Sequence, residues 1–142
     1  MALESTGRTH WEGDLFNGSG MASLDSGAAD PMEVTWKART EEHGGLTSPE
    51  ELIAAAHSSC FSMAFSNGLA KNETPPKSLD VTATATFVPG EGITTMKLDV
   101  VGDVEGITEE KFQELAEAAK DGCPVSQALA GNVDISITAR LA

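Results

Sequence analysis

Two cysteines, Cys60 and Cys123, carry the most reactive side chains of this 142-residue chain. Cys60 lies in a long apolar stretch, and burial among apolar side chains raises the pKa of a thiol and leaves it inert. Cys123 precedes Pro124, so we expect it at a helix N-terminus, where backbone N–H groups favour a thiolate. Two thiols on different helices suggest an attacking and a resolving thiol. The alternative is that both are packing residues that never meet.

A reactive thiol at Cys60 requires a cation, and the candidates are the three arginines Arg8, Arg39 and Arg140. Arg8 and Arg140 lie near the ends of the chain, where we expect them in solvent. Arg39 lies on the polar side of a strand-like run and needs a carboxylate partner, because an unpaired buried guanidinium is costly. Glu50 is the candidate carboxylate. From spacing alone, a surface ion pair and an acid at the start of a helix explain these two residues more simply.

His57 lies three residues before Cys60, on the same face of a helix. A Cys–His couple suits a hydrolase with a nucleophilic cysteine, whereas a packed or solvated histidine is the simpler interpretation. The cysteines and histidines have no close metal-ligand spacing, so we expect no zinc site. The chain has no dinucleotide-binding glycine motif, P-loop or nucleophile elbow.

The composition and the first residues indicate which classes of partner and which cellular compartment to expect. A net charge of −13 argues against nucleic-acid binding, which depends on contacts between basic residues and phosphates. No apolar run reaches the roughly 18 residues of a membrane span. The first residues lack the features of a signal peptide, so we expect a cytoplasmic protein. The length predicts a single domain over residues 1–142.

A central helix is predicted over residues 47–69, with Cys60 in its middle. Ser48 is a suitable N-cap, Pro49 suits the first helical position, and Glu51 completes a capping box. The stretch is apolar on nearly every face, which predicts a long buried helix. Gly68 is expected to end it.

The remaining elements follow from hydrophobic periodicity and turn residues. Alternation predicts strands at residues 9–15, 21–24, 33–40, 79–88, 93–101 and 132–141. Helices are predicted at residues 109–120, capped by Thr108, and 125–129, preceded by Pro124. Because strands and helices are segregated rather than alternating, the fold class is α+β with antiparallel sheets.

Three segments resemble the OsmC/Ohr family. The stretch SPEELIAAAHSSCFSMAFS is similar to the family's first cysteine motif, and KDGCPVSQAL is similar to its second. The opening THWEGDLFNGSG and the AHSSCFSMA form resemble the OsmC branch in particular. The resemblance covers nearly the whole chain, and the two motifs together are highly specific.

This resemblance implies an intertwined α+β homodimer with two active sites at the subunit interface. It implies a thiol peroxidase that reduces organic hydroperoxides, and hydrogen peroxide less well. Cys60 would be the peroxidatic cysteine and Cys123 the resolving one, joined in a transient disulfide. Glu50 matches the family's catalytic glutamate, and Arg39 matches its arginine, with Arg8 as the second choice.

The resemblance also implies an external dithiol reductant, such as a lipoylated protein, and no cofactor in the chain itself. It further implies a role in the response to osmotic stress. The preference for alkyl hydroperoxides is expected from nearby apolar residues, namely Phe61, Met63, Phe65, Leu69 and Phe112. The competing hypothesis is a non-catalytic, stress-related dimer that binds an apolar ligand on the same scaffold.

Overall fold

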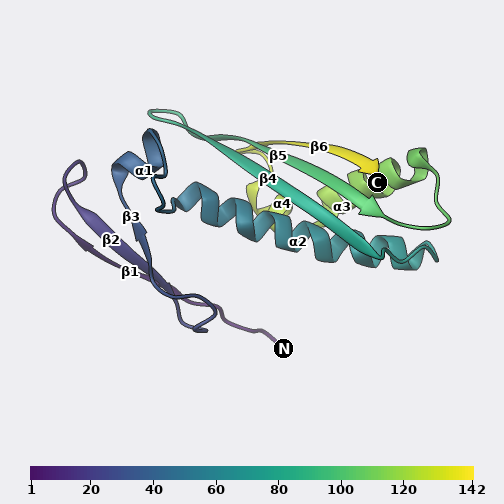
Figure 1. Cartoon of the computed structure of the whole chain (residues 1–142), viewed down its shortest axis with the longest axis horizontal. Helices are drawn as coiled ribbons and strands as arrows, with labels where there is room; N and C mark the ends of the chain where they lie inside the picture. The colour runs from purple at the N-terminus through teal and green to yellow at the C-terminus, as the bar shows by residue number, and fades with distance from the viewer. The chain divides into compact units, whose positions relative to one another are not determined.

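The computed structural model describes residues 1–142 and divides into two compact units, Met1–Leu52 and Ile53–Ala142. Whether the whole chain acts as one domain stays a prediction. The first unit contains an antiparallel sheet in the order β1-β2-β3, formed by β1 (Gly7–Glu12), β2 (Ser19–Leu24) and β3 (Met32–Val34) (Figure 1). The two strands predicted first in the chain therefore form the expected hairpin.

The strand predicted over residues 33–40 is wrong beyond Val34. The chain turns instead into a short helix, α1 (Trp36–Thr40), which carries Arg39. Thr35 is its N-cap, and its side-chain oxygen accepts a hydrogen bond of 3.1 Å from the backbone N–H of Ala38. Threonine at this position satisfies a free helix donor, and that local bond overrides the alternating pattern.

The central helix, α2 (Pro49–Lys71), begins where predicted and ends later. The Ser48 hydroxyl oxygen accepts a hydrogen bond of 3.1 Å from the N–H of Glu51, which is one half of the predicted capping box. The Glu51 carboxylate accepts a hydrogen bond of 2.7 Å from the Thr47 hydroxyl instead of closing the other half. Gly68 does not end the helix, which continues to Lys71.

Only one stripe of α2 is buried in the chain, rather than nearly every face. Its members recur every three or four residues: Glu50, Ala54, His57, Phe61, Phe65 and Leu69. The opposite side is exposed at Ala55, Ala56, Ser59 and Met63. Small and apolar residues thus occupy both sides, but only one side packs within the chain.

The second unit contains a three-stranded sheet in the order β4-β5-β6, formed by β4 (Ser78–Val88), β5 (Gly92–Asp103) and β6 (Asp134–Leu141). The predicted hairpin of β4 and β5 is confirmed, and its pairing is antiparallel. β6 differs from the purely antiparallel expectation, because it pairs parallel to β5. A parallel neighbour requires a crossover, which α3 (Glu109–Gly122) and α4 (Pro124–Leu129) supply.

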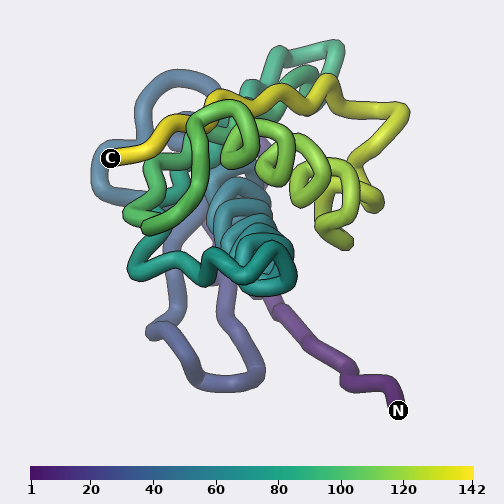
Figure 2. The backbone as a smooth tube through the Cα atoms, turned by 90° about the vertical axis from the view of Figure 1, so that its right-hand side faces the viewer, coloured from purple at the N-terminus to yellow at the C-terminus, as the bar shows by residue number.

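Helices α2, α3 and α4 lie on one face of this sheet (Figures 1 and 2). The core between the layers contains Phe61, Phe65, Leu69, Leu98, Val100, Val104, Phe112, Ala116, Ala119, Cys123 and Ala139. The rings of Phe65 and Phe112 lie 4.9 Å apart at its centre. The α+β class is therefore confirmed, and Cys123 belongs to the core that joins α3 to the sheet.

Candidate active site

The structure brings the two predicted cysteines together within the second unit. Cys60 is half-buried on α2, and Cys123 is fully buried at the N-cap of α4. Both are free thiols, and their side chains are hydrogen-bonded to each other. The backbone N–H of Val125, in the first turn of α4, also donates a hydrogen bond to the Cys60 sulfur. The N-terminal end of α4 thus places the Cys123 thiol beside that of Cys60.

Burial raises the pKa of the Cys60 thiol, and the hydrogen bond to Cys123 raises it further, whereas the Val125 N–H lowers it. The net shift is upward, so these neighbours favour the protonated, less nucleophilic form. The basic residues of the same unit do not offset this shift. Three of them pair with acids, in Lys77–Glu105, Lys111–Glu114 and Lys120–Glu117. The other three, Lys71, Lys97 and Arg140, are exposed.

His57 lies on the same face of α2 as Cys60 and is fully buried. Its Nε2 lies 2.7 Å from the Ser126 hydroxyl oxygen, whereas its Nδ1 is buried without a hydrogen-bond partner. Burial lowers the pKa of His57, so the ring is neutral at physiological pH. With Nε2 bonded to Ser126, the geometry lends no support to a Cys–His hydrolase.

Arg39 and Glu50 form an ion pair within the first unit. Arg39 Nε and Nη2 lie 2.9 and 2.8 Å from the same oxygen, Glu50 Oε1. The Glu50 side chain is only 7% exposed, and that of Arg39 is 31% exposed. Glu50 Oε2 is buried and has no hydrogen-bond partner. The predicted pairing is confirmed, and its catalytic role stays a prediction.

The alternative arginine, Arg8, is paired in a different way. Its Nε and Nη2 donate to the two carboxylate oxygens of Asp25, at 2.7 and 2.9 Å. The side chains are 70% and 40% exposed, so this is a solvated surface pair at the β1–β2 hairpin. Exposed pairs of this kind contribute little to stability. The buried carboxylate at Glu50 therefore distinguishes Arg39 from Arg8.

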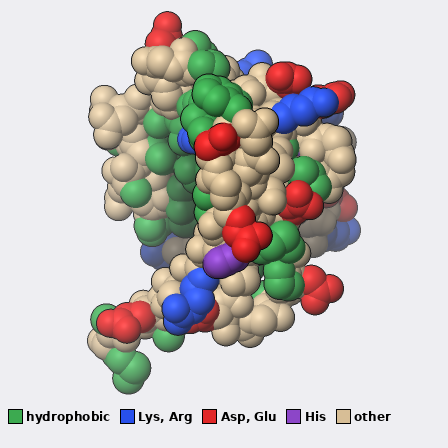
Figure 3. Space-filling view, turned by 90° about the vertical axis from the view of Figure 1, so that its left-hand side faces the viewer, with side chains coloured by type: hydrophobic (Ala, Val, Ile, Leu, Met, Phe, Trp, Pro, Cys, Tyr) green, Lys and Arg blue, Asp and Glu red, His purple; other side chains and the backbone are tan.

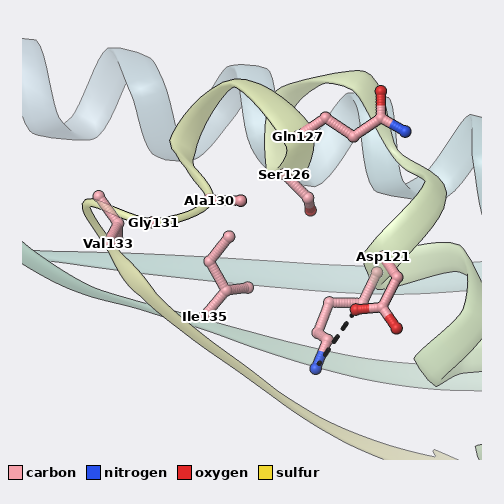
Figure 4. A pocket seen from close by; sticks show the side chains of 8 residues that line it. Asp121, Ser126, Gln127, Ala130, Gly131, Val133 and Ile135 are labelled. Carbon is pink, nitrogen blue, oxygen red and sulfur yellow. Dashed lines mark ion pairs between the residues drawn. The ribbon is translucent and has the colours of Figure 1, made fainter.

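A separate pocket of about 240 Å³ lies beside α4 in the second unit. Its lining residues are Lys120, Asp121, Ser126, Gln127, Ala130, Gly131, Val133 and Ile135. Ser126 points from α4 toward the space that Ile135 faces, whereas Gln127 points away (Figure 4). Neither cysteine lines this pocket, so it is not the site of the thiol chemistry.

Surface charge, metal ligands and helix length can be described from the structure. Acidic side chains are spread over the face in Figure 3, with basic side chains between them and no continuous basic patch. No cluster of three or more His, Cys, Asp or Glu side chains could hold a metal ion. None of the helices combines the length and apolar character needed to cross a membrane.

The chain was compared with protein families and with known proteins. The family model described as OsmC-like protein matches residues 42–138, which include Glu50 and both cysteines. Peroxiredoxin OsmC of Escherichia coli is 38% identical over 138 residues, covering 95% of this chain and 96% of that protein.

The chain belongs to the OsmC/Ohr family.

Its relatives include both branches of the OsmC/Ohr family. The organic hydroperoxide resistance protein OhrB of Bacillus subtilis is 31% identical over 121 residues, covering 84% of this chain and 88% of that protein. The crystal structure of an organic hydroperoxide resistance protein OsmC from Legionella pneumophila superposes with a TM-score of 0.76 at 21% identity. The superposition covers 99% of this chain and 98% of the Legionella pneumophila chain, so the two proteins have the same fold.

Two residues of the thiol site were not identified from the OsmC/Ohr motifs. Ser126 and Val125 follow Pro124 in the first turn of α4, and both contact groups on α2. The sequence places them at a helix start, but nothing in it indicates that this turn faces His57 and Cys60. That contact depends on the crossover from β5 to β6.

Proposed function

We propose that this member of the OsmC/Ohr family is a two-cysteine thiol peroxidase that reduces organic hydroperoxides. The observation that carries the proposal is the hydrogen-bonded pair of free thiols, Cys60 and Cys123. The names of its relatives, a peroxiredoxin and an organic hydroperoxide resistance protein, support the same activity.

In the first step, the Cys60 thiolate attacks the terminal oxygen of the hydroperoxide. A sulfur–oxygen bond forms as the O–O bond breaks, and the alkoxide leaves as the alcohol after taking up the proton that the thiol released. The sulfur is oxidised by two electrons, and the peroxide is reduced. Cys60 becomes a sulfenic acid.

This step requires a cation because the neighbours of Cys60 raise its pKa. We assign this role to Arg39, which Glu50 orients through their ion pair. Arg39 would stabilise the thiolate and the charge that develops on the leaving alkoxide. The buried Glu50 Oε2, which lacks a partner within the chain, is consistent with a carboxylate retained for function rather than stability.

In the second step, the Cys123 thiol attacks the sulfur of the Cys60 sulfenic acid. The disulfide forms and one water molecule leaves, made from the sulfenic hydroxyl and the thiol proton. An external dithiol, such as a lipoyl group, then reduces the disulfide by thiol–disulfide exchange and is itself oxidised. No cofactor bound to the chain is required.

The expected reason for a substrate preference needs correction. Phe61, Phe65, Leu69 and Phe112 are fully buried in the core, so they cannot contact a substrate. Met63 is the exception, with 73% exposure. The preference for organic hydroperoxides is proposed from the relatives' names, and a kcat/KM for hydrogen peroxide equal to that for cumene hydroperoxide would exclude it.

We also place the active protein in a homodimer, as the family resemblance implies. The exposed side of α2, with Ala55, Ala56, Ser59 and Met63, is the kind of small, apolar surface that a second copy could cover. Sedimentation velocity at several concentrations measures the mass. A monomer at all of them would remove this part of the proposal.

The function is tested by counting thiols in the reduced protein before and after one equivalent of cumene hydroperoxide. The wild-type protein is expected to lose both thiols within seconds and to form an intramonomer Cys60–Cys123 disulfide. Cys123→Ser is expected to lose its single thiol to a sulfenic acid, which dimedone traps. If both wild-type thiols survive, the cysteines are packing residues and the non-catalytic dimer becomes the better hypothesis.

A further inference from the structure

Two contacts connect α2 to the first turn of α4. One is the thiol contact, in which Cys60 meets Cys123 and the N–H of Val125. The other is the bond between His57 Nε2 and the Ser126 hydroxyl, at 2.7 Å. Cys60 and His57 are three residues apart on α2, and Val125 and Ser126 are adjacent on α4. The second contact therefore lies about one turn along α2 from the first.

The His57–Ser126 contact is protected from water. His57 is fully buried, and Ser126 is only 4% exposed although it lines the pocket in Figure 4. The imidazole of His57 makes one hydrogen bond, between Nε2 and Ser126, since its Nδ1 has no partner. A buried, half-satisfied histidine costs stability compared with an apolar side chain, so its presence indicates another role.

We propose that His57 and Ser126 are positioning residues for disulfide formation, an inference that rests on the peroxidase function proposed above. Their hydrogen bond holds the first turn of α4 against α2, so that Cys123 stays beside Cys60 after Cys60 has been oxidised. Neither His57 nor Ser126 is a catalytic residue, since neither bonds to a reacting sulfur.

A contact without sulfur is needed because the thiol contact changes during turnover. Oxidation of Cys60 adds a hydroxyl group to the sulfur that Cys123 and Val125 contact. The His57–Ser126 bond involves no reacting atom, so it is the same in the thiol, sulfenic acid and disulfide states. Without it, the sulfenic acid would wait longer for Cys123, and a second peroxide could oxidise it to the sulfinic acid.

The test removes the Ser126 hydroxyl and measures the two steps separately. Reduced Ser126→Ala and wild-type proteins are mixed with cumene hydroperoxide without reductant, quenched at intervals and analysed by mass spectrometry. We expect sulfenic acid to form at the wild-type rate. Disulfide formation should slow about tenfold, the effect of one lost buried hydrogen bond, and the sulfinic acid should appear at lower peroxide concentrations.

Three further variants separate positioning from packing. Ser126→Thr keeps the hydroxyl and should retain fast disulfide formation, whereas Ser126→Val, of the same shape without the hydroxyl, should lose it. This pair decides the question even if Ser126→Ala is poorly folded. Gln127→Ala, on the adjacent residue whose side chain points in a different direction from that of Ser126 (Figure 4), should behave as wild type in both steps.

The outcomes distinguish this inference from the proposed function. Wild-type protein that keeps both thiols refutes the peroxidase, and the inference falls with it. Wild-type protein that turns over, with Ser126→Ala and Ser126→Val forming the disulfide at the wild-type rate, refutes the inference alone. Equal slowing of both steps in these variants would also refute it, since that is the result of a general structural defect.

Discussion

Replacing Arg39 by glutamine, with Arg8→Gln as the matched control, tests the assignment of the active-site arginine. Both residues form ion pairs within the first unit, and both substitutions remove one positive charge. The pairs differ in burial, since Glu50 is 7% exposed and Asp25 is 40% exposed. We therefore expect different losses of stability and of activity.

The loss of stability follows from the burial of Glu50. At the 2.8 Å separation of Arg39 and Glu50, the attraction is about 6 kcal/mol at an effective dielectric constant of about 20. Desolvation of Glu50 offsets most of this, and solvent around the 31% exposed Arg39 screens part of the rest. Removing Arg39 leaves a buried carboxylate unpaired, for a net loss of about 2 kcal/mol, or roughly 6 °C in Tm. Removing Arg8 should cost less than about 0.5 kcal/mol.

The assay is urea unfolding at equal protein concentrations, followed by kcat/KM for cumene hydroperoxide with excess dithiol. Arg39→Gln should lower kcat/KM by about a hundredfold or more, the effect of removing one group that stabilises transition-state charge. Arg8→Gln should stay within about twofold of wild type. Full activity in Arg39→Gln would refute its catalytic role, and loss of activity in Arg8→Gln would transfer that role to Arg8.

Three other perturbations have defined outcomes. Burial lowers the pKa of His57, so the unfolded chain binds the proton first as the pH falls below about 6.5, and the unfolding free energy decreases. In urea titrations at about pH 7.5 and 5, His57→Gln should lose this contribution to the pH dependence. Burial raises the pKa of Cys60, so its alkylation by iodoacetamide in Arg39→Gln should be slower than in wild type at neutral pH and should accelerate in alkaline solution. Equal rates in the two proteins would contradict a cation at the thiol. Gly102→Ala would place a Cβ 2.6 Å from the buried Phe112 ring and should lower the unfolding free energy by about 1–3 kcal/mol. Gly68→Ala, in helix α2, would place a Cβ with no atom within 4 Å and should raise the unfolding free energy by about 0.5–1 kcal/mol. Calorimetry measures both changes.

Most of the fold could be predicted because local signals were strong. The capping box at Ser48 and the Thr108 cap located both long helices, and alternation located β4 and β5. The errors occurred where one local bond or a distant pairing decided the structure. The segment predicted as the end of a strand forms α1, which Thr35 caps. Strand β6 pairs parallel to β5, and hydrophobic periodicity does not indicate the direction of pairing.

The sequence indicates the candidate residues, whose catalytic roles stay predictions, but not how they are arranged. The types and order of Cys60, Cys123 and Glu50 match family motifs, and the need for a carboxylate beside Arg39 followed from charge. The bond of His57 to Ser126 could not be predicted, because these residues are 69 positions apart and meet only through the packing of α2 and α4. The substrate argument failed for the same reason, since apolar composition does not distinguish a core from a pocket.

The positions of the two thiols also affect how the protein would withstand the stress that it is proposed to relieve. A bond between Cys60 and Cys123 would close a covalent ring containing β4, β5 and α3, the larger part of the second unit. In the chain-entropy model, a ring of this length destabilises the unfolded state enough to add about 4 kcal/mol to the unfolding free energy. The oxidised intermediate would then be the most durable form of the chain, and a shortage of reductant would leave the protein inactive but resistant to unfolding and proteolysis until thiols returned.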